Sequence, residues 1–244
     1  MQATIAVPSF LKHHKIPLYI VVDELAEKML RGINSKYLRM VRVEKYREIA
    51  AEQVKIKDFY VFPYDRDGDS DKAYTSLKPM IMERVISEIA PETEYILSMD
   101  ADTIFSGNII NKVEAELNKV NHAYDLYMVA RNDPRMLKTR AGSPGSGFTL
   151  WKKSSRFIKN FRNHYIERYA GPHGGSQNLI NALRVSMNSF LFTDPLLHMV
   201  SPDLQNPALT DAEIWEMQPA YIHLHGRNSY QRLLRFKAVF ERGV

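Results

Sequence analysis

The stretch YILSMDADTIFSGN, residues 95–108, joins a short apolar run to two carboxylates. Residues Tyr95–Met99 are mostly apolar and lead into polar turn residues, which is the pattern of a buried strand. If the strand extends to Asp102, its side chains alternate between faces, so Asp100 and Asp102 point to the same side. Carboxylate oxygens suit Mg²⁺ and Mn²⁺, which usually keep positions open for phosphate oxygens. The stretch therefore predicts a divalent cation that holds a diphosphate at the end of a strand.

An Asp-x-Asp pair alone is a weak signal, because many such pairs are solvated turns at strand ends. The surrounding pattern adds weight, since apolar strand-like runs alternate with helix-like segments through the first hundred residues. This alternation predicts an α/β sandwich with a mostly parallel central sheet, in which ligands bind at the carboxyl ends of strands. The expected strands are Thr4–Phe10, Leu18–Asp23, Leu38–Val43, Phe59–Phe62 and Tyr95–Met99, and the expected helices are Glu24–Ile33, Glu44–Lys57 and Tyr74–Ile89.

The second half of the chain continues with shorter elements and longer loops. The expected helices are Ile109–Val120 and Ser154–Tyr169, the strands are Leu126–Ala130, Gly147–Trp151 and Phe190–Thr193, and the loops are Arg131–Ser146, Gly171–Asn181 and Asp194–Glu216. No internal repeat or low-complexity linker interrupts this order. We therefore expect one domain that spans residues 1–244.

Composition bounds the class of protein. With 45% hydrophobic and 25% charged residues, the chain can form an ordinary globular core. The absence of cysteine excludes disulfides and thiolate metal sites. No apolar run reaches the length of a membrane span, and the N-terminal residues lack the order of a signal peptide, so we expect a soluble, cytoplasmic chain.

The charge balance favours small anionic ligands. Lysine and arginine number 33 against 28 aspartates and glutamates, a net charge of +5. Such an excess would help to attract nucleoside diphosphates or an anionic membrane surface, so a peripheral membrane contact stays open. The basic residues are dispersed and no recognition motif accompanies them, so we expect no nucleic-acid partner.

Four motifs resemble those of one enzyme family. They are YTSLKP (74–79), MDADT (99–103), GSGFTLW (145–151), and a motif in two parts, SQNLIN (176–181) and HLHG (223–226). Together they resemble the metal-dependent glycosyltransferases of the GT-A fold. The likeness is strongest to family eight, the type of glycogenin and the bacterial lipopolysaccharide galactosyltransferases. It covers nearly the whole length and implies a nucleotide-binding half at about 1–108 and an acceptor-binding half at about 109–244.

The resemblance implies a metal site. MDADT is similar to the family's LDxD, and HLHG to its HxxG, whose histidine is the third ligand of the cation. It therefore implies that Asp100, Asp102 and His223 bind Mn²⁺ or Mg²⁺, with His225 as the register alternative. Two carboxylates and a neutral imidazole would leave room for phosphate oxygens. As an alternative, a histidine in YIHLH could be a packed, hydrogen-bonded core residue.

The resemblance also implies contacts to a nucleotide-sugar donor, most often a UDP-sugar. Pro8 and Ala101 are expected beside the nucleotide, and Lys78 stands in the donor segment where the family usually has arginine. Asp23 could bind a ribose or base, although a helix cap explains it as well. In the loop after HLHG, Gly226 and Arg227 are expected at the diphosphate.

Acceptor and catalytic residues come from the remaining segments. GSGFTLW is similar to the family's NAGVxL strand, which implies that Gly145, Ser146 and Gly147 line the acceptor side. In SQNLIN, Gln177 matches the position associated with retaining enzymes. The expected function is hexose transfer from a UDP-sugar to a glycan or other hydroxyl, with retention, and with Gln177 and Asp102 as catalytic residues.

Two other functions fit parts of the sequence. A HAD-like phosphohydrolase also uses Asp-x-Asp-x-Thr, with the first aspartate as nucleophile and the second as acid/base, although normally in its first strand. A catalytically silent sugar-nucleotide-binding domain is permitted because Ser176 and Asn178 replace two aspartates of the family motif.

Overall fold

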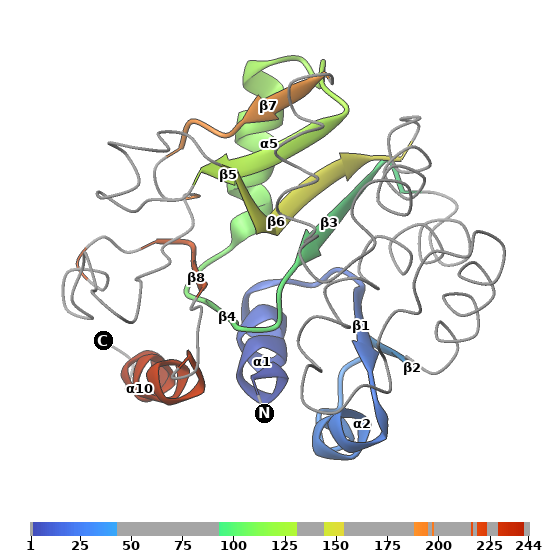
Figure 1. Ribbon diagram of the computed structural model, residues 1–244, viewed down its shortest axis with the longest axis vertical. Coiled ribbons are helices and arrows are strands. Elements are labelled where there is room, and N and C mark those ends of the chain that lie inside the picture. The colour runs from blue at the N-terminus through green and yellow to red at the C-terminus, as the bar shows by residue number, and fades with distance from the viewer. Residues whose placement is uncertain are drawn as a thin grey trace, which may run out of the picture.

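The computed structural model describes residues 2–42, 93–130, 144–153, 188–194, 197, 216, 219–223 and 229–241. In this part of the chain no helix is both long and apolar enough to cross a bilayer. The elements, drawn in Figure 1, are α1 (Ala3–His13), β1 (Leu18–Val22), α2 (Glu24–Leu30), β2 (Leu38–Arg42), β3 (Tyr95–Met99), β4 (Thr103–Phe105), α5 (Ile109–Lys119), β5 (Leu126–Ala130), β6 (Pro144–Lys152), β7 (Ser189–Leu191), β8 (Tyr221–His223) and α10 (Ser229–Glu241).

The largest described sheet has the order β3-β6-β5-β7. Strand β6 runs antiparallel to β3 and β5, and β7 runs parallel to β5, so three of the four strands point the same way. Two smaller sheets pair β1 with β2 in parallel and β4 with β8 in antiparallel. The structure therefore confirms the expected α/β fold, with strands mostly in one direction in the largest sheet.

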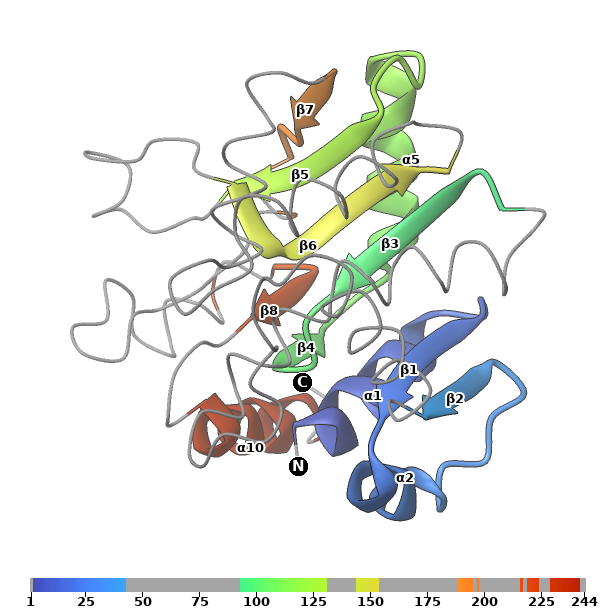
Figure 2. The ribbon, with the colours of Figure 1, turned by 45° about the vertical axis from the view of Figure 1, so that its right-hand side comes forward.

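Helix α5 covers one face of the largest sheet and lies behind it in both ribbon views (Figures 1 and 2). Asn108 caps its start by accepting hydrogen bonds from the backbone N–H groups of Ile110 and Asn111, at 3.0 and 3.3 Å. Ile109, Val113 and Leu117, four residues apart, form its buried stripe and join the core with side chains of β5 and β6. The helix expected from Ile109 is confirmed.

The segment expected to form the first strand, Thr4–Phe10, is helical, so that prediction is wrong. Its apolar side chains enter three separate core clusters: Ile5 packs with α10, Val7 with β1 and α2, and Phe10 with the main core. A helix buried on several sides has no single apolar stripe. Its sequence is therefore apolar without a helical period, like that of a buried strand, and Pro8 is a residue that disfavours a helix interior.

The buried strand expected at the apolar run before the aspartates is confirmed. β3 ends at Met99, and Asp100 continues its pairing by one bond, donating its backbone N–H to the Gly147 carbonyl oxygen at 3.0 Å. The chain then bends, and β4 pairs with β8 instead. The strand therefore does not extend to Asp102, so alternation along one strand does not place the two carboxylates. They nevertheless meet at one site, as expected.

Other expected elements agree closely with the structure or cannot be compared with it. β5 has its expected bounds, and β1, α2, β2 and β7 lie within three residues of theirs. Strand β6 begins at Pro144, so the expected loop 131–146 ends earlier than predicted. The elements expected at 44–57, 59–62, 74–89, 154–169 and 171–181, and nearly all of the loop expected at 194–216, lie outside the described residues.

Candidate metal site

Asp100, Asp102 and His223 meet where β3, β4 and β8 come together. The Nε2 atom of His223 lies 2.8 Å from Asp102 Oδ1 and 3.5 Å from Asp100 Oδ2. Each residue offers one ligand atom, and these atoms lie within 4.8 Å of one another. The imidazole is fully buried, while the Asp100 and Asp102 side chains are 31% and 19% exposed. The cluster is thus anchored in the core on the histidine side and accessible on the carboxylate side.

The pairing of β4 with β8 brings the histidine to the aspartates. Thr103, the residue after Asp102, lies opposite His223 in the antiparallel register. The neighbouring pair, Ile104 and Ile222, joins a buried cluster with side chains of α1 and α10. Because side chains alternate along a strand, burial of this isoleucine pair turns His223 to the opposite face. Both views show α1 and α10 beneath β4 (Figures 1 and 2).

Gly147 on β6 fits so closely against the site that a side chain there would force its neighbours to move. A Cβ atom there would lie 2.3 Å from Cε1 and 2.6 Å from Nδ1 of His223, and 2.9 Å from Asp100 Oδ2. These distances are far below van der Waals contact, so a side chain at this position would displace the imidazole. The structure therefore places Gly147 directly against two of the metal-ligand candidates, although the sequence pointed only to an acceptor-side position.

The donor atoms fit a divalent cation. Atoms bound to one ion at about 2.1 Å cannot be more than about 4 Å apart, so a cluster within 4.8 Å needs only a small adjustment to bind one. Two carboxylate oxygens and one imidazole nitrogen suit Mn²⁺, and Mg²⁺ through the oxygens. An imidazole that is already buried would lose little further side-chain freedom when an ion binds.

Sequence reasoning missed Tyr221, a fully buried side chain next to the site. Its ring stacks on Phe148, with ring centres 4.9 Å apart. Tyr221 and His223 are two residues apart in β8, so their side chains lie on the same face of the strand. Burial raises the pKa of the Tyr221 hydroxyl well above its usual value, and the negative charge of Asp100 raises that pKa further. The signal in the sequence is its position two residues before the histidine within a strand.

The remaining predicted site residues divide into two groups. Within the described part, Pro8 is exposed on α1 and Ala101 is exposed in the bend between the aspartates, while Gly145 and Ser146 continue β6 before Gly147. Asp23 caps α2, accepting a hydrogen bond from the Ala26 backbone N–H at 2.7 Å, as the capping alternative predicts. Lys78, Gln177, His225, Gly226 and Arg227 lie outside the described residues.

Neither a family profile nor a curated protein sequence matches this chain. Solved structures do match it. Mouse xyloside xylosyltransferase 1, in its apo form, has a TM-score of 0.56 and 12% sequence identity, over 93% of this chain and 92% of that protein. The glycosyltransferase GlyE of Streptococcus pneumoniae TIGR4 has a TM-score of 0.58 and 13% identity, over 99% of this chain and 56% of GlyE.

The galactosyltransferase LgtC, in complex with donor and acceptor sugar analogues, has a TM-score of 0.58 and 12% identity, over 98% of this chain and 91% of LgtC. Another LgtC structure, described as an active-site mutant in which glutamate replaces glutamine, has a TM-score of 0.54 and 11% identity, over 98% of this chain and 91% of LgtC. At such low identity the likeness establishes the fold. This chain adopts the GT-A fold of these glycosyltransferases.

Proposed function

We propose that this chain is a metal-dependent glycosyltransferase that moves a hexose from a UDP-sugar to a hydroxyl of a glycan acceptor. The observation that carries the proposal is the convergence of Asp100, Asp102 and His223 to within 4.8 Å on a GT-A fold. The sequence motifs that carry the two aspartates and the histidine lie far apart in the chain. Their meeting at one point supports a shared ligand.

The described residues would serve the reaction mainly by position. A Mn²⁺ or Mg²⁺ ion held there would neutralise the charge that develops on the departing diphosphate. His223, fully buried, fixes one side of the ligand set, and Asp102 lies 2.8 Å from it with its side chain partly exposed toward the solvent. This arrangement leaves the carboxylate side open to the phosphates of a donor.

The donor and acceptor assignments rest on the motifs. Lys78, Gly226 and Arg227 are proposed to contact the diphosphate, and the net charge of +5 would favour an anionic donor. Residues 1–108 would supply most of the nucleotide contacts, and residues 109–244, with Gly145 and Ser146, most of the acceptor contacts. LgtC is described in complex with donor and acceptor sugar analogues, which supports both classes of ligand for this fold.

Retention at the anomeric carbon is the proposed stereochemical outcome. The chain has Gln177 in the SQNLIN segment, where the resembling family has its retaining-type glutamine. One LgtC structure carries a glutamine replacement described as an active-site mutation, which supports a glutamine in the active site of this fold. In this route the departing diphosphate would accept the proton of the acceptor hydroxyl, so no carboxylate base is needed.

Calorimetric titration tests the proposal. UDP-sugars and GDP-sugars are titrated into the protein with Mn²⁺ and with EDTA, and then into Asp102→Ala. Asp125→Ala, a partly buried aspartate at the far end of the largest sheet, is the matched control. We expect one UDP-sugar to bind only with Mn²⁺, Asp102→Ala to abolish this binding, and Asp125→Ala to preserve it. Absence of nucleotide binding under every condition would contradict the proposal and leave the phosphohydrolase as the next activity to assay.

Binding without turnover would identify the silent-domain alternative. Donor hydrolysis and transfer to a panel of glycan acceptors are therefore measured on the same protein. Proton NMR of the first product would show whether the anomeric configuration is retained.

A further inference from the structure

Two hydroxyl groups buried beside the metal site have no hydrogen-bond partner among the described residues. They are Thr103 Oγ1 and the phenolic oxygen of Tyr221, on side chains that are each 1% exposed. A buried hydroxyl without a partner destabilises a fold, because its hydrogen bonds to water are lost and not replaced. Such a group in a well-packed core therefore calls for an explanation.

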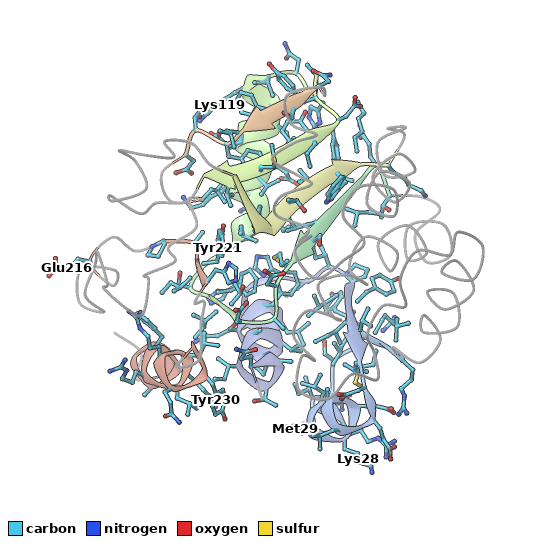
Figure 3. All side chains as sticks on the ribbon, in the orientation of Figure 1. Lys28, Met29, Lys119, Glu216, Tyr221 and Tyr230 are labelled. Atoms are coloured by element: carbon cyan, nitrogen blue, oxygen red, sulfur yellow. The ribbon has the colours of Figure 1, made fainter. Side chains whose placement is uncertain are left out.

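Packing holds the Tyr221 ring in one position. Phe148 stacks on it with an interplanar angle of 20°, and Phe105 lies opposite it in the β4–β8 register, with ring centres 6.4 Å apart. In Figure 3 Tyr221 lies in the middle of the molecule, whereas Lys28, Met29 and Lys119 lie at its edges. A ring fixed on two sides cannot swing its hydroxyl out to water.

The surroundings of the phenol point to Asp100. The Tyr221 ring stacks on Phe148, and the backbone N–H of Asp100 donates to the carbonyl oxygen of the preceding residue, Gly147. The tyrosine ring and the aspartate backbone therefore contact adjacent residues of β6. Asp100 is the charged group that acts on the phenol. At neutral pH a phenol carries its proton and can act as a donor, while the ionised carboxylate of Asp100 can only accept.

We propose that Tyr221 is a positioning residue of the metal site, whose hydroxyl donates a hydrogen bond to the Asp100 carboxylate when a divalent cation is bound. This inference rests on the proposed function, since it requires the cation at Asp100, Asp102 and His223. Ligating carboxylates are commonly held by such outer hydrogen bonds, which fix their orientation and strengthen metal binding. The unsatisfied hydroxyl is then a cost of the metal-free state that metal binding removes.

This assignment predicts opposite effects of one substitution in two states. Tyr221→Phe keeps the ring and its stack on Phe148 and removes only the oxygen. Without metal, the variant should melt at the same temperature as the wild type or a few degrees higher, because an unsatisfied buried hydroxyl is gone. With UDP present, its affinity for Mn²⁺ should fall about 10-fold or more, because Asp100 loses its outer hydrogen bond.

Tyr127→Phe is the matched control. Tyr127 is also fully buried, but its hydroxyl accepts a hydrogen bond from the Tyr124 backbone N–H at 3.0 Å, on the far side of β6 from β3. This variant should melt at a lower temperature and bind Mn²⁺ as the wild type does. Affinity is measured from the electron paramagnetic resonance signal of free Mn²⁺ in the presence of UDP, and stability from melting curves without metal.

The outcomes separate this inference from the function on which it rests. If the wild type binds no Mn²⁺, both are overturned. If the wild type binds Mn²⁺ and Asp102→Asn does not, the metal site stands, and an unchanged affinity in Tyr221→Phe overturns the positioning role alone. A Tyr221→Phe variant that loses stability without metal to the same extent as Tyr127→Phe would also overturn it, because its hydroxyl would then be part of the metal-free core.

Discussion

Two buried histidines in this fold have different neighbours. His14, at the end of α1, is 3% exposed, and both of its ring nitrogens bind backbone. Its Nδ1 donates to the Phe10 carbonyl oxygen at 2.8 Å, and its Nε2 accepts the Ile109 N–H at 2.9 Å. The ring thereby joins the end of one helix to the start of another. It needs no ligand to complete its hydrogen bonds.

His223 is equally buried, yet its Nε2 faces two carboxylates. Two negative groups beside one imidazole suit a cation that all three can share, which backbone neighbours do not. Burial alone therefore does not distinguish a structural histidine from a ligand. The chemistry of the groups around the ring nitrogens does.

Replacing His223 should have the largest effect on ligand binding. His223→Leu removes the nitrogen ligand and leaves two carboxylates, so affinity for Mn²⁺ in the presence of UDP should fall at least about 100-fold. Isothermal titration with Mn²⁺ measures this loss. A variant that binds Mn²⁺ as tightly as the wild type would show that His223 is a core residue like His14.

Replacing His14 should lower the stability of the fold and leave ligand binding unchanged. His14→Ala leaves the Ile109 N–H without a partner and removes one of the two hydrogen bonds that the Phe10 carbonyl accepts. It also removes a ring stacked on Phe10, with ring centres 4.2 Å apart. The free energy of unfolding should fall by about 2–4 kcal/mol. Urea denaturation measures this change. Folded His14→Ala should bind Mn²⁺ and UDP normally, and a large loss of affinity would remove the distinction between the two histidines.

Gly147→Ala tests how closely β6 fits the ligand histidine. The new methyl group would overlap Cε1 and Nδ1 of His223, so the imidazole must move away from the carboxylates. Affinity for Mn²⁺ should fall about 10-fold by the same titration. Gly107→Ala is the control, because a Cβ there has open space around it, and its affinity should be unchanged. Equal affinities in both variants would contradict the observed fit.

The smallest expected effect is a pH dependence of stability that comes from His14. Burial lowers the pKa of His14, and the charge of His13 lowers it further, while the bond to the Phe10 carbonyl opposes both. The unfolded chain therefore takes up a proton below pH about 6.5, while the folded protein does not until a lower pH. The stability that His14 contributes is complete above pH about 6.5 and is lost as the pH falls below it.

Between pH 7.5 and 5.5 the wild type should lose unfolding free energy through this residue, by no more than about 1.4 kcal/mol, the limit for one proton over one pH unit. Urea denaturation at both pH values measures the loss, and His14→Gln should show a correspondingly smaller one. An identical pH dependence in the variant would show that His14 takes up its proton equally in both states.

Local sequence pattern predicted the elements whose burial follows one simple period. β3 is a short apolar run bounded by polar residues, and α5 has a capping asparagine and apolar residues four apart. α1 was predicted wrongly because its apolar residues serve three clusters formed by distant segments. No window of local sequence contains that information.

The candidate site was predictable only in part for a similar reason. The aspartates are recognisable from their strand, but their pairing with His223 depends on the contact of β4 with β8, and only the family resemblance linked those segments. The role of Tyr221 and the closeness of Gly147 to the imidazole depend on packing between strands. Such distances follow from tertiary structure and have no pattern in the chain.

The most direct test of the metal site is anomalous diffraction from crystals soaked with Mn²⁺ and UDP, recorded at the manganese absorption edge. We predict one anomalous peak within bonding distance of Asp100, Asp102 and Nε2 of His223, with UDP phosphate oxygens completing the coordination. A UDP molecule bound without a manganese peak at these residues, or a peak elsewhere in the molecule, would contradict the account.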